Sequence, residues 1–325
     1  MRINSTWRWL AAPSTHCTTC RTRLVPYLPA CTSCQTKTPV QMQEVARRPH
    51  DLQKQADDVR VGHLSDLHIG HPPKDIASPL ATFRIWIEHF QRHDVDVVVL
   101  SGDVVERPGD VFGMQQARTI LEQCGMNWVV VPGNHDVKRP GYHDDFHDVF
   151  GRFPRLETYH GLHFILFDSM AGLPLEERDI AERMYGDYVC YTEGRVGAPQ
   201  MMVAEKLLAK AGPGERVVVL HHHVMRQHAD LMPRVPKRAG LTEDVLGTMK
   251  ALLDADALFD WCKRFAISTI YHGHKHLYQQ PGMREGNLLV LNAGSSTLSR
   301  KRQRARLIDH HPNGDKTLMN VGLHL

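Results

Sequence analysis

Five short apolar runs, each followed at once by Asp, Asn or His, constrain this chain more than any other feature. The runs are four to six residues long and rich in Val and Ile. Helix-like stretches separate them, a pattern that predicts parallel strands buried on both faces. Open sheets of this kind collect their ligands at the carboxyl ends of the strands, so the pattern predicts one metal site at one edge of an α/β fold. The runs and the residues that follow them are 59–64 with Asp66 and His68, 95–100 with Asp103, 128–131 with Asn134 and His135, 217–220 with His221, His222 and His223, and 267–271 with His274 and His276.

The spacing within these blocks supports the prediction. In an extended Asp66-Leu67-His68 segment, alternation sends the carboxylate and the imidazole to the same side, where both can bind one ion. The block at 273–276 repeats the pattern around Lys275. Glycines at positions 102, 133 and 273 stand at the ligand turns, where the absence of a Cβ permits a sharp bend or a close backbone approach.

Together the five blocks resemble the motifs of the calcineurin-like metallophosphoesterase superfamily. Those motifs are Asp-x-His, Gly-Asp, Gly-Asn-His-Asp, a His after a fourth strand, and Gly-His-x-His, and all occur here in order from Asp66 to His276. The resemblance covers roughly residues 58 to 310, and five ordered blocks are far more specific than any single match. It implies a sandwich of two mixed β-sheets flanked by helices, whereas the periodicity alone predicts only an α/β fold.

The resemblance also implies a ligand set for two divalent ions. Asp103 would bridge the ions, while His135 would stay off both. His222 is assigned as a ligand because His222-His223-Val224 lines up with a His-His-Pro stretch of relatives, but Val224 replaces the proline and leaves His221 open as the ligand instead. The implied ligands are Asp66, His68, Asp103 and His276 for the first ion, and Asp103, Asn134, His222 and His274 for the second.

Such a site predicts phosphoester chemistry. Two divalent ions about 3.5–4 Å apart lower the pKa of a bridging water and stabilise the charge that develops during displacement at phosphorus. Mixed His, Asp and Asn ligation suits Mn, Fe or Zn better than Ca. The expected catalytic residues are Asp103, Asn134 and His135. His135 would orient the substrate or protonate the leaving oxygen, and Asp136 would hold that imidazole or cap the next segment.

We therefore expect a phosphodiesterase, closest in motif style to class III cyclic nucleotide phosphodiesterases. A small phosphodiester or cyclic nucleotide is favoured as substrate because His135 follows Asn134. The alternative within enzymes is a nuclease acting on DNA or RNA. From a different class, a non-catalytic scaffold is the weaker alternative, since such relatives have lost ligands and this chain has every one.

A second metal-binding pattern precedes the expected catalytic domain. Cys17, Cys20, Cys31 and Cys34 form two Cys-x-x-Cys pairs with ten residues between them, which predicts one structural zinc in a ribbon-like module. A compact rubredoxin-like knuckle and two disulfides are the alternatives. We divide the chain into this module at 1–39, a linker at 40–57 and a metallophosphoesterase domain at 58–325. The module is basic and would aid binding if the substrate were a nucleic acid.

Composition narrows the choice of partner and cellular location. The chain has 325 residues, 42% of them hydrophobic, and a net charge of only +3, so no strong field for polyanions is expected over the whole chain. No apolar run approaches the ~20 residues of a membrane span, and the N-terminus lacks the apolar stretch of a secretory signal. These features predict a cytoplasmic protein whose partner is a small phosphorylated substrate.

Some features allow two interpretations. His143 and His147 have the i, i+4 spacing of metal ligands on a helix, but the acidic residues beside them favour a solvated polar face. The basic residues at 300–306 fit either a nucleic-acid contact or the wet face of an edge strand. His63, inside the first apolar run, is interpreted as a packed or hydrogen-bonded core residue.

Overall fold

The fold is described from a computed structural model. The structure describes residues 54–71, 78–137, 142–172, 193–224, 252–276, 287–297 and 303–322, together with the backbone of residues 2–9, 42–46 and 283–285. The four cysteines of the expected zinc module and the basic residues 300–302 lie outside these ranges.

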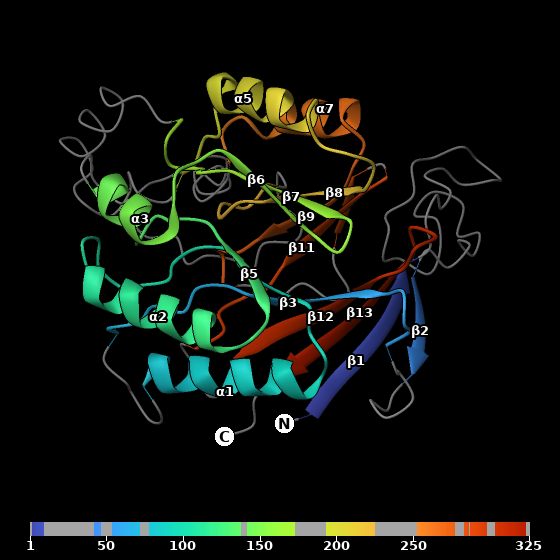
Figure 1. The fold of residues 1–325 in the computed structure, drawn as a ribbon, viewed down its shortest axis with the longest axis horizontal. Coiled ribbons are helices and arrows are strands. Elements are labelled where there is room, and N and C mark those ends of the chain that lie inside the picture. The colour runs from blue at the N-terminus through green and yellow to red at the C-terminus, as the bar shows by residue number, and fades with distance from the viewer. Residues whose placement is uncertain are drawn as a thin grey trace, which may run out of the picture.

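The strands of the described residues form two stacked sheets (Figure 1). The first has seven strands in the order β2-β1-β13-β12-β3-β4-β5, and the second has six in the order β10-β11-β9-β8-β7-β6. Both sheets are mixed, with a parallel centre and antiparallel neighbours. The strands of the first sheet are β1 (Arg2–Trp9), β2 (Met42–Ala46), β3 (Val59–Leu64), β4 (Val97–Leu100), β5 (Asn127–Val130), β12 (Arg304–His310) and β13 (Lys316–Gly322). Those of the second are β6 (Arg155–Tyr159), β7 (Leu162–Leu166), β8 (Glu215–Val219), β9 (Ile267–His272), β10 (Met283–Glu285) and β11 (Leu288–Asn292).

Helices cover the outer face of each sheet, so the molecule has four layers (Figure 1). Helices α1 (Pro79–Arg92), α2 (Val111–Gln123) and α3 (Tyr142–Phe150) pack on the first sheet. Helices α5 (Ala198–Leu208) and α7 (Ala255–Arg264) pack on the second. The predicted fold, a sandwich of two mixed sheets flanked by helices, is confirmed.

Strand alternation explains how one sequence fills three apolar layers. In β4, Val97 and Val99 point into the space between the sheets, whereas Val98 and Leu100 point towards the helices of the first face. All four are fully buried. Continuous apolar runs of this type are therefore the expected sequence of strands covered on both faces.

Helix α1 shows the local rules that place the outer layers. Ser78 caps it by accepting a hydrogen bond from the amide of Ala81, 3.3 Å away, and Pro79 occupies the first turn, where its missing amide costs nothing. Its apolar residues recur at helical spacing and are buried against the first sheet. The helix-like stretch expected between the first two apolar runs is confirmed as a helix from Pro79 to Arg92.

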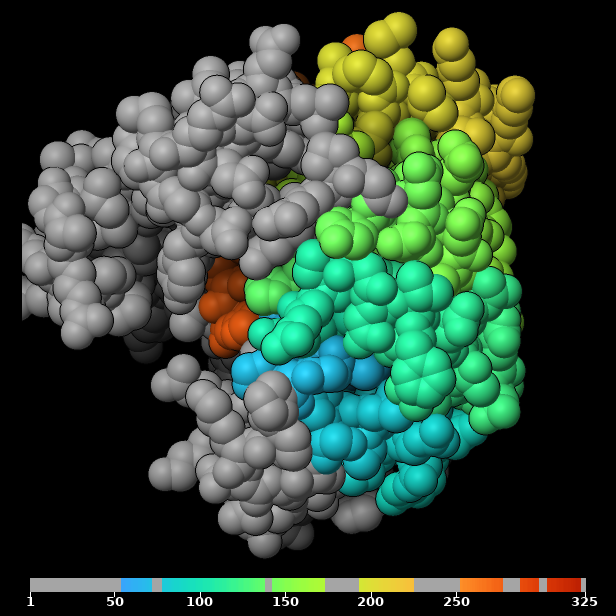
Figure 2. Space-filling view, turned by 90° about the vertical axis from the view of Figure 1, so that its left-hand side faces the viewer, coloured from blue at the N-terminus to red at the C-terminus, as the bar shows by residue number. Residues whose placement is uncertain are grey.

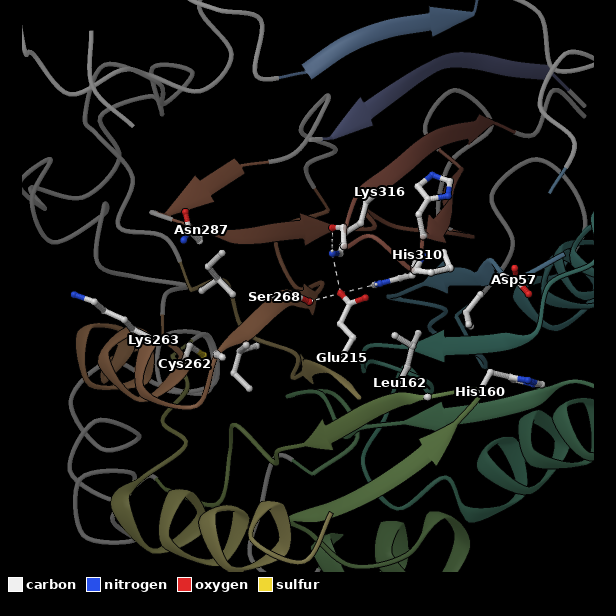
Figure 3. A pocket seen from close by; sticks show the side chains of 18 of the residues that line it. Asp57, His160, Leu162, Glu215, Cys262, Lys263, Ser268, Asn287, His310 and Lys316 are labelled. Atoms are coloured by element: carbon white, nitrogen blue, oxygen red, sulfur yellow. Dashed lines mark hydrogen bonds and ion pairs between the residues drawn. The ribbon is translucent and has the colours of Figure 1, made fainter. Parts of the chain in front are cut away.

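At the edge where the parallel strands begin, a charged network links the two sheets (Figure 3). One carboxylate oxygen of Glu215, at the start of β8, lies 3.1 Å from Nδ1 of His310, at the end of β12, and 2.7 Å from Nζ of Lys316, at the start of β13. Ser268 also donates to this oxygen. Burial alone would raise the pKa of Glu215, but His310 and Lys316 hold that pKa far below its usual range. The network lines a pocket on the edge opposite the strand ends at which ligands were predicted.

Two N-terminal strands take part in the first sheet. Residues 2–9 pair with β13 and with residues 42–46, so both segments extend that sheet. The cysteine module itself lies outside the described residues, and its zinc stays a prediction.

The interpretation of residues 304–306 as the wet face of an edge strand is wrong. Strand β12 lies between β13 and β3, and Arg306 is fully buried. Its Nε donates to the carbonyl of Asn292 at 2.8 Å and its Nη1 to Oδ1 of Asn320 at 3.0 Å. Arg306 therefore uses its donors inside the sheet.

Among the described helices, none is long and apolar enough to cross a membrane.

Candidate metal centre

Loops that follow β3, β4, β5, β8 and β9 bring the predicted ligands together at the carboxyl edge of both sheets. Backbone hydrogen bonds fix the first two loops to each other, because the amides of Asp66 and His68 donate to the carbonyls of Gly102 and Asp103, each at 3.0 Å. Figure 2 views the molecule from this side and shows blue, green and orange segments meeting beside one another, although they are far apart in the sequence.

One cluster of ligand atoms contains Asp66, His68, Asp103 and His276. Nε2 of His276 lies 3.1 Å from Oδ1 of Asp66 and 3.2 Å from Nε2 of His68. Nε2 of His68 lies 3.7 Å from Oδ2 of Asp103. The three residues other than His276 are almost completely buried. This cluster is the set that the resemblance implied for the first ion.

A second cluster lies on the other side of Asp103. Nε2 of His221 is 3.4 Å from Oδ2 of Asp103 and 3.1 Å from Oδ1 of Asn134. Nδ1 of His274 is 2.9 Å from the same Asn134 oxygen and 3.2 Å from Nε2 of His221. Oδ2 of Asp103 therefore faces both clusters at once, as a bridging ligand would.

The donor sets fit transition-metal ions. Donors bound at about 2.0–2.2 Å to one tetrahedral or octahedral ion stand roughly 3–3.5 Å apart, which matches the spacing within each cluster. Hydrogen-bond partners outside the clusters orient two of the imidazole rings towards the ligand clusters. Nδ1 of His221 lies 2.8 Å from the carbonyl of Ser101, and Nδ1 of His68 lies 2.8 Å from Oε2 of Glu106, so in each ring Nε2 faces the cluster and can bind an ion when it carries no proton.

The backbone at the ligands is strained in a consistent way. Of the seven residues that form the two clusters, five lie in the left-handed region, which non-glycine residues seldom adopt. Each such residue costs on the order of 1 kcal/mol, and residues of this kind gather at functional sites. The five are Asp66 (φ 55°), His68 (φ 51°), Asp103 (φ 52°), His274 (φ 75°) and His276 (φ 50°).

Two of the predicted glycines allow the loops to touch. A Cβ on Gly133 would lie 2.3 Å from the backbone nitrogen of Asp103 and 2.2 Å from its Oδ1. A Cβ on Gly273 would lie 1.7 Å from Oγ of Ser65 and 2.6 Å from Oδ2 of Asp66. The close backbone approach that the sequence predicted at these turns is confirmed.

Electrostatics favour an ionised bridging carboxylate. Burial alone would raise the pKa of Asp103, but His221, His135 and His68 hold that pKa well below its usual range. Burial alone would likewise lower the pKa of His221, yet Asp103 raises it to about 9. In the absence of ions the pair is therefore a buried ion pair, and a metal ion would compete with the proton on His221.

The three adjacent histidines have different surroundings. His221 reaches Asp103 and Asn134, as described above. Nδ1 of His222 instead lies 2.7 Å from Oγ of Ser169, and its ring centroid is 4.5 Å from that of His274. His223 is buried against His272 on the far side. Of the two candidate ligands for the second ion, His221 lies in the second cluster. His222 lies outside that cluster and is hydrogen-bonded to Ser169.

His135 stands beside the clusters. Its amide donates to Oδ1 of Asp103 at 2.9 Å, and its Nδ1 lies 3.0 Å from the carbonyl of Glu106. Asp136 does not hold this imidazole. Its carboxylate accepts hydrogen bonds from the amides of Gly133, Val104 and Val105, so it fixes the two ligand loops together. Burial, and the negative charge of Asp103, raise the pKa of Asp136 to about 7.

Glu106 is the residue that sequence reasoning missed. Its carboxylate lies 2.8 Å from Nδ1 of His68 and 3.3 Å from Nδ1 of His71. Burial would raise the pKa of Glu106, but hydrogen bonds to these two imidazoles lower it to about 2. The one available signal was its place three residues after Asp103, within the same ligand loop.

Two His, Asp and Asn clusters that share one carboxylate at the edge of a β-sandwich define a dinuclear metallohydrolase type of site. The model of the calcineurin-like phosphoesterase family matches residues 59–278. The chain therefore belongs to this family, which indicates a metal-dependent phosphoester hydrolase.

Two solved structures are similar to this chain. A purple acid phosphatase from yellow lupin (Lupinus luteus) seeds superposes with a TM-score of 0.52 at 15% identity, covering 78% of this chain and 50% of that one. A dimetal phosphatase from Danio rerio superposes with a TM-score of 0.47 at 11% identity, covering 77% of this chain and 95% of that one. At these identities the likeness concerns the fold alone. No curated protein sequence matches this chain.

Proposed function

We propose that this chain is a binuclear metal-dependent phosphodiesterase that hydrolyses a small phosphodiester or cyclic nucleotide. The observation that carries the proposal is the position of Asp103, whose Oδ2 lies 3.7 Å from Nε2 of His68 and 3.4 Å from Nε2 of His221. One carboxylate oxygen thus serves two separate ligand clusters.

We assign His221, in place of His222, to the second ion. The assignment is supported by the 3.1 Å distance from its Nε2 to Oδ1 of Asn134 and by the Ser101 carbonyl that holds its other nitrogen. Two bound ions of the Mn, Fe or Zn class would supply an activated water and neutralise charge on the phosphoryl group. The proposed ligands are Asp66, His68, Asp103 and His276 for one ion, and Asp103, Asn134, His221 and His274 for the other.

His135 is the proposed proton donor. Its Nδ1 faces the carbonyl of Glu106, which can only accept, so this nitrogen carries a hydrogen. Nε2 is then left to serve the substrate, and in the imidazolium form it can donate a proton to a leaving oxygen. The ring is partly exposed, which gives a substrate access to it. A group of this kind is more useful for an alkoxide leaving group than for one that leaves readily by itself.

A nuclease is the principal alternative. It would need basic residues at the surface, and Arg306, one of the basic residues counted in its favour, is fully buried. A nuclease would bind an oligonucleotide with a steep salt dependence.

The test is a hydrolysis screen in Mn of the full-length protein and the Asp103→Asn variant. The substrates are bis-p-nitrophenyl phosphate, p-nitrophenyl phosphate, cyclic AMP and a short single-stranded oligonucleotide. Turnover of the diester or of cyclic AMP, lost in the variant, supports the proposal. Cleavage of the oligonucleotide alone moves the assignment to a nuclease, and inactivity on all four favours the scaffold.

We also propose one structural zinc at Cys17, Cys20, Cys31 and Cys34, and a cytoplasmic location, on the sequence evidence. Zinc content compared between wild type and Cys17→Ser tests the first proposal. Equal zinc content in the two proteins would remove the basis for the module.

A further inference from the structure

A third group of metal-ligand side chains lies outside the two clusters at Asp103. His143 and His147 of α3 and Asp168, which follows β7, place one ligand atom each within 4.8 Å of one another. Nδ1 of His143 is 2.8 Å from Oδ2 of Asp168. The i, i+4 spacing puts both imidazoles on one face of α3, the arrangement by which a helix offers two histidines to one ion.

Hydrogen bonds fix the orientation of Asp168 in the absence of an ion. Its Oδ1 accepts hydrogen bonds from the amides of Met170 and Ala171, at 2.7 and 3.2 Å. Gln200 accepts from its amide at 3.1 Å and donates to its carbonyl at 2.7 Å. With the side chain 2% exposed, Oδ2 is the oxygen left to face α3. A ligand whose orientation is fixed by such outer partners loses little freedom on binding.

His147 supplies an independent observation. Both of its ring nitrogens are closed off from solvent, and neither has a hydrogen-bond partner among the described residues. A neutral imidazole always carries one N–H and one lone pair, and leaving such groups buried and unpaired costs about 1–3 kcal/mol each. Native structures rarely keep groups in this state without an ion or a water to satisfy them.

Two imidazoles and one carboxylate are the donor set of a mononuclear zinc-type site with an open fourth position. The nitrogen donors disfavour Ca and Mg, which require oxygen ligands. We propose that His143, His147 and Asp168 bind one divalent ion of the zinc class, separately from the two ions at Asp103. This ion would tie α3 to the loop after β7.

The test counts zinc in the full-length protein. Wild type, His147→Ala and the control Asp148→Asn are equilibrated with micromolar Zn²⁺, freed of unbound ion and measured by elemental analysis. Asp148 is the exposed neighbour of His147 on the same helix and is not among the grouped ligands. We expect His147→Ala to hold one zinc fewer per chain than both other proteins, and equal counts in all three would overturn the proposal.

Two further measurements keep the result interpretable. If His147→Ala does not fold, as judged by circular dichroism, His143→Gln takes its place with the same expected loss of one ion. A site that fills only at millimolar Zn²⁺ would be an adventitious ion only, and would also overturn the proposal. Turnover in Mn reports the ions at Asp103 separately, so failure of the phosphodiesterase assignment leaves the zinc count unaffected.

Discussion

Replacing Gly133 by alanine should damage the centre by a predictable amount. The new Cβ would lie 2.3 Å from the backbone nitrogen of Asp103, while ordinary van der Waals contact begins at 3.4 Å. Because that nitrogen belongs to the main chain, no side-chain rotation relieves the overlap, and the two ligand loops must separate by about 1 Å. A displacement of about 1 Å in a catalytic constellation costs roughly 100-fold in rate. Gly133→Ala should therefore lower kcat on bis-p-nitrophenyl phosphate by about that factor.

The matched control is Gly212→Ala, because a Cβ at that position meets nothing within 4 Å. Both variants are assayed in Mn at equal concentrations of folded protein, with circular dichroism to verify the fold. We expect Gly212→Ala to behave like wild type. Turnover by Gly133→Ala within about threefold of wild type would refute the claim that loop contact at Asp103 sets the geometry.

Three further predictions concern other parts of the molecule. Arg60 and Asp309 form a buried ion pair through two hydrogen bonds of 2.6 and 2.8 Å. Asp309→Asn should therefore lower the free energy of unfolding by about 3–5 kcal/mol. Glu122→Gln, in the exposed pair with Arg118, should change it by less than about 0.5 kcal/mol. Urea titration measures both, and a similar small loss in each would contradict the burial argument. Burial and neighbouring cations lower the pKa of His89 to about 3, so between pH 3 and 6.5 the unfolded chain binds an extra proton there. This contribution to stability is fully present above pH ~6.5 and is lost as pH falls, by about 2 kcal/mol between pH 7 and pH 5. His89→Leu should remove that part of the pH dependence, and an unchanged slope would count against it. Finally, His135→Ala should lose turnover while keeping both ions, and loss of ions on elemental analysis would show that His135 is a ligand.

The sequence contained enough information to predict the layers and most of the site. Continuous apolar runs such as Val97 to Leu100 indicate strands that are buried on both faces, and ligand residue types placed directly after such strands indicate the edge where they meet. The i, i+3 and i+4 spacing of apolar residues in α1 was equally informative, because burial of one helix face requires it.

What the sequence could not supply depends on register and on contacts between distant loops. His221 and His222 are adjacent residues of the same type, so the sequence does not distinguish them. Only the turn after β8 determines which ring faces Asp103 and which faces Ser169. Arg306 looks like a surface residue until β12 is seen to lie inside the sheet. Glu106 has no periodic signal, since its role depends on where the loop after β4 places its carboxylate.

The central claim is that Asp103 serves two ions at once. The measurement that tests it most directly is the number of Mn ions bound per chain, by elemental analysis, in wild type and in Asp103→Asn after equilibration and removal of free metal. The shared position of Oδ2 predicts that the variant binds two ions fewer than wild type. A loss of one ion would show that Asp103 serves a single ion, and an unchanged count would show that it holds none.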